Sequence, residues 1–353
     1  MPLGAQKAAL LGAAGSGGGG FKAFGGDIID FVSTISPVTG PMRAHVFTGT
    51  NKMFVMEGEK DVHYWIIAGG GATATYSSGA AGGGGGGVRG SLIQSADSSG
   101  TASLPVVNIT SAGGPSSDGV YPIVVGPGGT RPNLHNTANG SGPWNAGDSV
   151  PYARGGDSSA LGLTASGGAP NSYSGGNNND AYGEGGNGGG AGGGTATGGS
   201  GNKGGYSPAE GTAGGNSISY SGWYAPCSGG GGGGGGTTAA GAQGAGGGGQ
   251  GGNGTACNWM GYPMYSRFGG GGGGGAGYNC SQAGGNAFYG GGKGSNSTGN
   301  TTNGSPGGSQ ETSGRGIPNT GGGAGGSHAN AGSNYNRPQG GGSGIVIISY
   351  LRD

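Results

Sequence analysis

Residues 82–90 read Gly-Gly-Gly-Gly-Gly-Gly-Val-Arg-Gly, and longer glycine runs occur at 229–236 and 269–275. Glycine accounts for 106 of the 353 residues. The runs lack the Gly-X-Y repeat that a collagen triple helix requires, so collagen is excluded. The formal net charge is zero, with 14 basic and 14 acidic residues. A disordered chain held open by charge repulsion is therefore excluded as well.

Runs of six to eight glycines are unsuited to α-helices and ordinary sheets, because glycine loses more backbone entropy on folding than any other residue. The polyglycine-II conformation suits them better, with three residues per turn, a rise of about 3.1 Å and backbone polar groups that point sideways. Those groups find partners only if several such helices lie side by side. We therefore expect a bundle in which each run is one rod and the segments between runs are its end turns.

Ordinary globular sequence occupies the N-terminal third of the chain. Short runs rich in β-branched and aromatic residues at 44–47, 53–56 and 62–67 predict a small antiparallel meander. Residues 344–350 carry the strongest strand signal and would favour aggregation if left unpaired, so we expect them to pair with 62–67. Further strands are predicted at 91–94, 105–110 and 121–125.

The predicted fold class is mostly β and irregular, with a small antiparallel β-module that carries a polyglycine-II bundle with long end loops. Three parts are expected. They are an attachment segment and linker at 1–40, a β-rich module at 41–130 completed by strand 344–350, and a glycine-rich polyglycine-II domain at 131–343.

Aromatic side chains gather in the segments between the glycine runs. Rigid aromatics set among Asn, Ser and Gly are typical of binding loops, because they offer contact area at a low entropy cost. The alternative is that these rings fold back and cap the ends of the bundle. The residues predicted to bind a receptor are Trp144, Tyr152, Tyr206, Tyr220, Trp223, Tyr224, Trp259, Tyr262, Tyr265 and Phe268.

Several separate motifs together resemble the glycine-rich tail-fibre adhesins of tailed bacteriophages. The motifs are His45-Val46-Phe47-Thr48, Met53-Phe54-Val55, Tyr64 to Gly71 leading into 82–90, Tyr121 to Gly129, Gly155 to Gly168, and Gly341 to Tyr350. The resemblance spans about residues 44 to 350. It implies a stacked polyglycine-II domain whose variable loops contact a receptor on the bacterial surface. The chain departs from the pattern in the long segment 202–227 and in Ser349, where a basic residue is common.

The same resemblance sets the expected partners. They are a host cell-surface receptor, either an outer-membrane protein or a polysaccharide, and a tail fibre or other virion protein reached through the N-terminal segment. A homotrimer is left open. The protein is expected in the virion, at the tail fibre or tail tip, after synthesis in the host cytoplasm. Nucleic acid is not an expected partner, because the sequence has no basic block.

The sequence does not indicate an enzyme. It lacks a GxSxG elbow and an HExxH motif, and Lys293 is not followed by the Ser or Thr of a P-loop. Carboxylates such as Glu210 have no spacing that favours a glycosidase pair over turn capping. His45 is expected to pack within a strand. No catalytic residue, cofactor or metal site is predicted, and whether Cys227, Cys257 or Cys280 form a disulfide is left open.

Three non-enzymatic alternatives belong to other classes. The first is a structural glycine-rich virion component of the tail or baseplate that makes no direct receptor contact. The second is a glycine-rich wall or coat protein, against which the irregular aromatic loops argue. The third is an ice-binding bundle, which would need a strict three-residue repeat that the runs lack.

Overall fold

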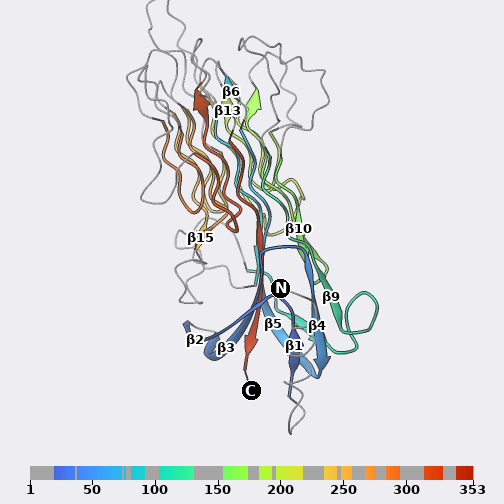
Figure 1. The fold of residues 1–353 in the computed structure, drawn as a ribbon. Coiled ribbons are helices and arrows are strands. Elements are labelled where there is room, and N and C mark those ends of the chain that lie inside the picture. The colour runs from blue at the N-terminus through green and yellow to red at the C-terminus, as the bar shows by residue number, and fades with distance from the viewer. Residues whose placement is uncertain are drawn as a thin grey trace, which may run out of the picture.

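The computed structural model describes residues 20–35, 38–73, 75–76, 81–91, 103–130, 154–173, 183–192, 196–217, 234–244, 248–256, 267–275, 284–294, 314–328 and 339–352. Within these ranges the regular elements are all β-strands. The strand-rich part lies at one end, and the glycine-rich segments extend from it side by side (Figure 1). The described part of the chain is therefore mostly β, as predicted from the sequence.

Two antiparallel sheets form the strand-rich end. The larger has the order β2 (Asp27–Ile35), β3 (Val38–Phe47), β17 (Ile345–Leu351), β5 (Glu59–Ile67) and β7 (Val88–Gly90), with β8 (Val107–Thr110) also paired to β5. The smaller has the order β1 (Lys22–Phe24), β4 (Asn51–Glu57) and β9 (Val120–Ile123).

The remaining strands are short pairs within or beside the glycine-rich part. Two pairs are antiparallel, β10 (Ser158–Ala160) with β11 (Leu163–Ala165) and β14 (Thr255–Ala256) with β15 (Arg267–Phe268). Two pairs are parallel, β12 (Ser172–Tyr173) with β13 (Ala191–Gly192) and β6 (Thr75–Tyr76) with β16 (Ser327–His328).

Strand β17 lies in the middle of the larger sheet, between β3 and β5. Ile345 is paired with Ile67, and the pairing with β5 continues to Ser349. Its Ile-Val-Ile-Ile sequence suits a strand with both faces buried, and six of its seven residues are buried. The predicted pairing of 344–350 with 62–67 is confirmed.

The larger sheet has an apolar core on each face. One core packs it against the smaller sheet and includes Met53, Ile66 and Ile348. The other includes Trp65 and Ile347 and is closed by residues next to the glycine runs. Because both faces of the larger sheet are buried, β5 ends with a continuous run of apolar residues and β17 begins with one.

The order of the strands differs from a meander. Strands β3 and β5 both pair with β17 and not with each other, while β4 belongs to the smaller sheet. The local pattern identified these strands but not their partners, because the central strand comes from the far end of the chain. The strand predicted at 91–94 lies, apart from Ser91, outside the described residues.

The strand-rich part also begins earlier than the predicted residue 41. Strand β1 pairs with β4, and all nine residues of β2 pair with β3. The glycine-rich part likewise begins before residue 131, because 68–73 and 81–87 lie within it. The predicted boundaries followed composition, whereas the chain passes between the two parts several times.

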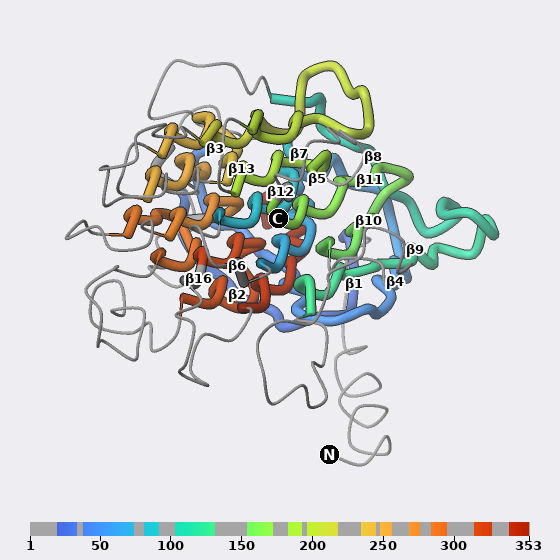
Figure 2. The backbone as a smooth tube through the Cα atoms, turned by 90° about the horizontal axis from the view of Figure 1, so that it is seen from above, coloured from blue at the N-terminus to red at the C-terminus, as the bar shows by residue number. Residues whose placement is uncertain are grey.

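Hydrogen bonds join the glycine-rich segments sideways. The backbone N–H groups of residues 83 to 87 donate to three neighbouring segments in turn, and residues three apart donate to the same neighbour. The pairs are Gly83 to Ala324, Gly84 to Ala169, Gly85 to Gly235, Gly86 to Gly321 and Gly87 to Ser166, with N···O distances of 2.7 to 3.0 Å. None of these bonds lies within the run itself. Viewed from above, the glycine-rich segments are short coiled traces arranged in rows (Figure 2).

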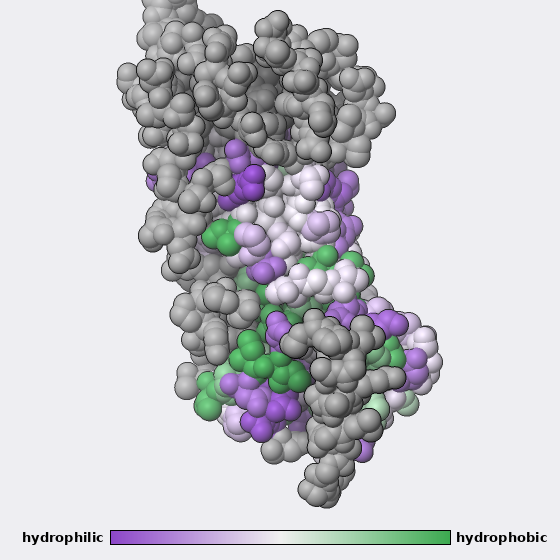
Figure 3. All heavy atoms as spheres, in the orientation of Figure 1, coloured by the Kyte–Doolittle hydropathy of each residue, from purple (hydrophilic) through white to green (hydrophobic). Residues whose placement is uncertain are grey.

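Side chains would not fit at most positions inside this array. A Cβ atom on Gly86 would overlap the backbone carbonyl of Ala68, and one on Gly83 would overlap the carbonyl of Gly71. Since backbone atoms cannot rotate away as a side chain can, these positions require glycine. The array has few side chains, and in Figure 3 much of its described surface is pale, above the green and purple patches of the strand-rich end.

Replacing Gly86 by Ala is expected to lower the free energy of unfolding by about 2 kcal/mol or more, because the new methyl group meets backbone. Gly49 provides the matched control, since a Cβ there has no atom within 4 Å. We expect Gly49→Ala to change stability by less than about 0.5 kcal/mol. Urea denaturation of both variants measures the difference, and equal midpoints would contradict the close packing described here.

Candidate functional site

The described residues include two of the ten predicted receptor-binding positions, Tyr206 and Phe268. The other eight lie outside the described residues, so their placement stays a prediction. They are Trp144, Tyr152, Tyr220, Trp223, Tyr224, Trp259, Tyr262 and Tyr265. The three cysteines also lie outside this part of the chain. The flanking residues still show where each of these segments begins and ends.

Phe268 is a core residue. Its side chain is fully buried in strand β15, and its ring centroid lies 5.8 Å from that of Trp65 in β5. A ring without exposed surface cannot contact a receptor, so the prediction for Phe268 is corrected. Its position directly before the run 269–275 gave no signal of burial, because the sheet that covers it is formed by distant parts of the chain.

The flanks of the aromatic segments divide between the two ends of the glycine array. Ala256 and Arg267, which flank segment 257–266, pair with each other in β14 and β15, beside the core around Trp65. Ser217, which precedes segment 218–233, lies at the opposite end. Gly215, two residues before Ser217, accepts a hydrogen bond from the backbone N–H of Ala191. Ala191 belongs to β13, which lies at the end far from the sheets (Figure 1).

Segment 131–153 also follows residues that lead away from the sheets. Gly126 accepts a hydrogen bond from Gly344 next to β17, and Gly129 accepts one from Gly341, three residues further from that strand. Segment 131–153 returns close to the strand-rich part, because Gly156 donates to Pro127 and accepts from Gly69, two residues past β5. The described flanks of 257–266 also lie beside the sheets, so 218–233 is the segment whose flanks lie far from them.

Tyr206 is held in a structured turn. The guanidinium of Arg89 lies over its ring at 4.0 Å from the centroid, and Arg89 also donates to the carbonyl of Thr164. Asn202 fixes the turn, because its side-chain oxygen accepts from the backbone N–H of Tyr206 and of Glu210 while its amide nitrogen donates to the Tyr206 carbonyl. Tyr206 is half-buried, so one face of its ring has a structural role. Its contact with a receptor stays a prediction.

Glu210 is a fully buried carboxylate at the base of this turn. It accepts hydrogen bonds from the backbone N–H of Ser166 at 2.7 Å and of Gly204 at 3.3 Å. Burial raises the pKa of the Glu210 carboxyl, against the opposing effects of these donors and of the nearby Arg89. The group joins the turn to the glycine array and has no second carboxylate among its described partners.

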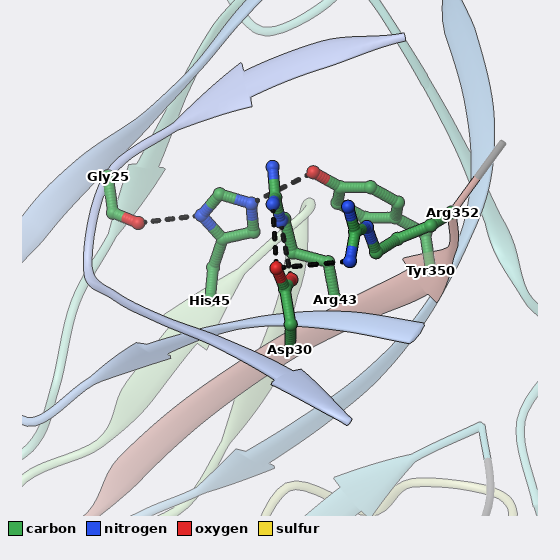
Figure 4. A network of polar contacts seen from close by, with 6 residues as sticks. All are labelled: Gly25, Asp30, Arg43, His45, Tyr350 and Arg352. Atoms are coloured by element: carbon green, nitrogen blue, oxygen red, sulfur yellow. Dashed lines mark hydrogen bonds and ion pairs between the residues drawn. The ribbon is translucent and has the colours of Figure 1, made fainter. Parts of the chain in front are cut away.

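A polar network crosses the opposite, strand-rich end (Figure 4). His45 of β3 is fully buried between the Gly25 carbonyl, at 2.7 Å from Nδ1, and the Tyr350 hydroxyl, at 3.2 Å from Nε2. Because a carbonyl can only accept, Nδ1 carries the hydrogen and Nε2 accepts from Tyr350. The expectation that His45 packs within a strand is confirmed, and burial lowers its pKa.

The charged members of this network are more exposed. Arg43 makes a bidentate contact with Asp30 at 2.7 and 2.9 Å, and Arg352 lies 3.2 Å from the same carboxylate. The hydrogen bond from Arg43 is the main cause of the lowered pKa of Asp30. Partly exposed pairs of this kind add little stability. Their effect here is to fix β2 and the end of β17 on either side of β3.

Within the described segments, no group of three or more His, Cys, Asp or Glu side chains is placed to hold a metal ion. The same segments include no helix long and apolar enough to cross a membrane. Comparisons with protein-family models, with curated proteins and with solved structures find no match to this chain.

Sequence reasoning missed Arg89, Asn202 and the buried role of Glu210. Each acts through groups that are distant in the sequence or belong to the backbone, so no spacing pattern marks them. Asn202 had one local signal, its place among Gly201, Gly204 and Gly205, which is typical of a turn. In the structure it adopts a positive φ of 56°, a conformation that Asn tolerates better than most residues.

Tyr206→Ala is expected to lower the free energy of unfolding by about 1–2 kcal/mol, because Arg89 loses the ring against which it lies. Tyr206→Phe keeps the ring and is expected to stay within about 0.5 kcal/mol of the parent protein. Chemical denaturation of the pair separates the ring contact from the hydroxyl group. Equal losses in both variants would contradict the role assigned to the ring.

Stability is expected to fall as the pH drops below about 6.5, where a histidine in the unfolded chain takes up a proton. Buried His45 resists protonation, so the unfolded state binds more protons than the folded state in that range. Half-buried His63, whose pKa is also lowered by burial, adds to this loss, whereas Glu210, with its raised pKa, opposes it at pH values above about 4.5. The difference in the pH dependence of stability between the parent protein and His45→Gln gives the contribution of the His45 imidazole. Thermal melting between pH 5 and 8 should show a shallower acid-side slope for the variant, and parallel curves would exclude the assignment.

Proposed function

We propose that the glycine-rich segments form a polyglycine-II bundle. Three observations support it: the bonds from residues 83 to 87 run sideways, they return to the same neighbour every third residue, and a Cβ atom on Gly83 or Gly86 would overlap neighbouring backbone. A helix with three residues per turn and no internal hydrogen bonds has this periodicity.

We propose that the protein is a bacteriophage tail-fibre adhesin that recognises a receptor on the host cell surface and has no catalytic role. The observation that carries the proposal is that one part of the chain forms a close-packed scaffold and another part holds the aromatic segments. Close-packed glycine segments lead away from a double-cored sheet. They continue into long segments, 131–153 and 218–233, that hold aromatic residues among Gly, Ser and Asn. A rigid scaffold that presents such segments suits recognition.

The proposed recognition uses shape, aromatic stacking and neutral hydrogen bonds. The chain has a formal net charge of zero, so long-range charge attraction is not its means of binding. Aromatic rings next to amides and hydroxyls suit either a sugar or a protein loop, and both receptor classes remain in the proposal. We propose the end far from the sheets for the receptor site, with Tyr220, Trp223 and Tyr224 as its candidate residues, and Trp144 and Tyr152 as further candidates whose segment returns nearer the sheets.

Adsorption of labelled, purified protein to a panel of intact bacterial strains tests this function. A version with residues 218–233 replaced by Gly and Ser of equal length serves as the comparison, because its described scaffold is unchanged. Binding restricted to certain strains and lost on replacement would support a receptor-binding adhesin. Binding to no strain, or binding that survives the replacement, would favour the structural virion component without receptor contact.

Trp223→Ala is expected to weaken adsorption by about 2 kcal/mol or more, which is roughly 30-fold in Kd, as for a binding hot spot. Trp259→Ala is the matched control, since its segment begins and ends beside the sheets, and we expect less than a twofold change. Quantitative cell-binding curves give both values. A loss confined to Trp259→Ala would move the site to the near end, and no loss in either variant would remove both segments from it.

A further inference from the structure

The smaller sheet has an apolar outer face. Its inner residues, such as Met53 and Val55, fill the core, and the alternate residues point the other way. Phe54 is paired directly with Phe24 on one side and with Val120 on the other, which puts three apolar side chains in one row across the sheet. Phe54 is 40% exposed and Met56, two residues along the same strand, is 56% exposed.

Such a row is unusual for the solvent side of an antiparallel sheet, where polar residues normally alternate with the buried ones. Pro122 of β9 and Val124, the residue directly after that strand, extend it, and Val124 is 41% exposed. An exposed apolar patch of this extent indicates a contact with another surface. The outer face is defined here by its apolar residues Phe24, Phe54, Met56, Val120, Pro122 and Val124. Lys52, paired with Pro122, and Lys22, which forms an ion pair with Glu57, lie on the same side at its two ends.

The chain itself supplies a segment of suitable chemistry at the edge of this face. The described residues begin at Gly20, two residues before Lys22, the first residue of β1, which is an edge strand of the same sheet. Gly20 lies beside the turn that follows Met56, because a Cβ atom on Gly58 would be 3.8 Å from its carbonyl carbon. The 19 residues before it include Ala-Ala-Leu-Leu-Gly-Ala-Ala at 8–14.

The connecting residues are long enough for this contact. Residues 15–20 read Gly-Ser-Gly-Gly-Gly-Gly and can span about 20 Å when extended. Three neighbouring strands are only about 10 Å across. A connection of this length lets 8–14 reach any part of the outer face, and the small residues of that block allow close approach to Phe54 and Met56.

We propose that residues 8–14 pack on the outer face of the β1-β4-β9 sheet, with Leu10 and Leu11 as the main contacts. The N-terminal segment then has a place on its own chain, in addition to any role in attachment. This inference does not depend on the proposed receptor-binding function, since it concerns the opposite end of the molecule and uses none of the aromatic segments.

Methionine oxidation of the full chain tests the contact. Met56 lies on the outer face, and fully buried Met53 on the same strand is the internal reference. The double variant Leu10→Ser, Leu11→Ser should raise the rate of oxidation at Met56 several-fold by dilute peroxide and leave Met53 unchanged. Leu3→Ser, outside the block, should have no effect. Equal Met56 rates in the parent and the double variant would overturn the proposal.

A further measurement tests whether a second copy of the chain covers the outer face. If the rate at Met56 rises on tenfold dilution and does not respond to Leu10→Ser, Leu11→Ser, a second copy covers the face and the proposal is wrong.

A second experiment changes the outer face and measures access to the N-terminal segment. Phe54→Ser should speed tryptic cleavage after Lys7 relative to cleavage after exposed Lys203. If Met53 becomes reactive in Phe54→Ser, the fold is disturbed, and Val124→Ser takes its place with the same expected result. Unchanged cleavage after Lys7 in the folded variant would overturn the contact.

Discussion

The glycine-rich half of this structure depends on one requirement: a backbone N–H that has no partner in its own segment must find a carbonyl in a neighbouring one. Residues 83 to 87 satisfy it by donating to three surrounding segments in rotation. The requirement explains the absence of side chains, because a methyl group on Gly86 would occupy the place of the Ala68 carbonyl. It also explains why many glycine segments lie side by side, since a lone glycine segment would gain too little to offset its loss of backbone entropy.

The strand-rich end gives the array its starting points. Strands β5, β7 and β17 each continue directly into a glycine run or follow one, so the sheet sets the spacing and direction of the first segments. Both faces of that sheet are buried, one against the smaller sheet and the other against Phe268 and its neighbours. Ordinary hydrophobic packing at one end thus holds in register an array that has almost no side chains of its own.

The sequence predicted what depends on local pattern. The runs at 62–67 and 344–350 were recognisable as strands that pair, because β-branched residues and a need for burial mark both. Their arrangement was not predictable in the same way: β3 and β5 are separated by β17, a strand from some three hundred residues later. The candidate site shows the same limit. Aromatic content selected Phe268 and Tyr206 alike, but only the fold distinguishes a core ring against Trp65 from a half-buried ring under Arg89.

The central place of β17 has a consequence for biosynthesis. Of all the described strands it is the last to leave the ribosome, yet it separates β3 from β5, two strands made near the beginning. The strand edges that β17 covers remain unpaired through the synthesis of the glycine-rich part, so the nascent chain is open to edge-to-edge aggregation during that time. Closure of the sheet must therefore wait until β17 has been synthesised.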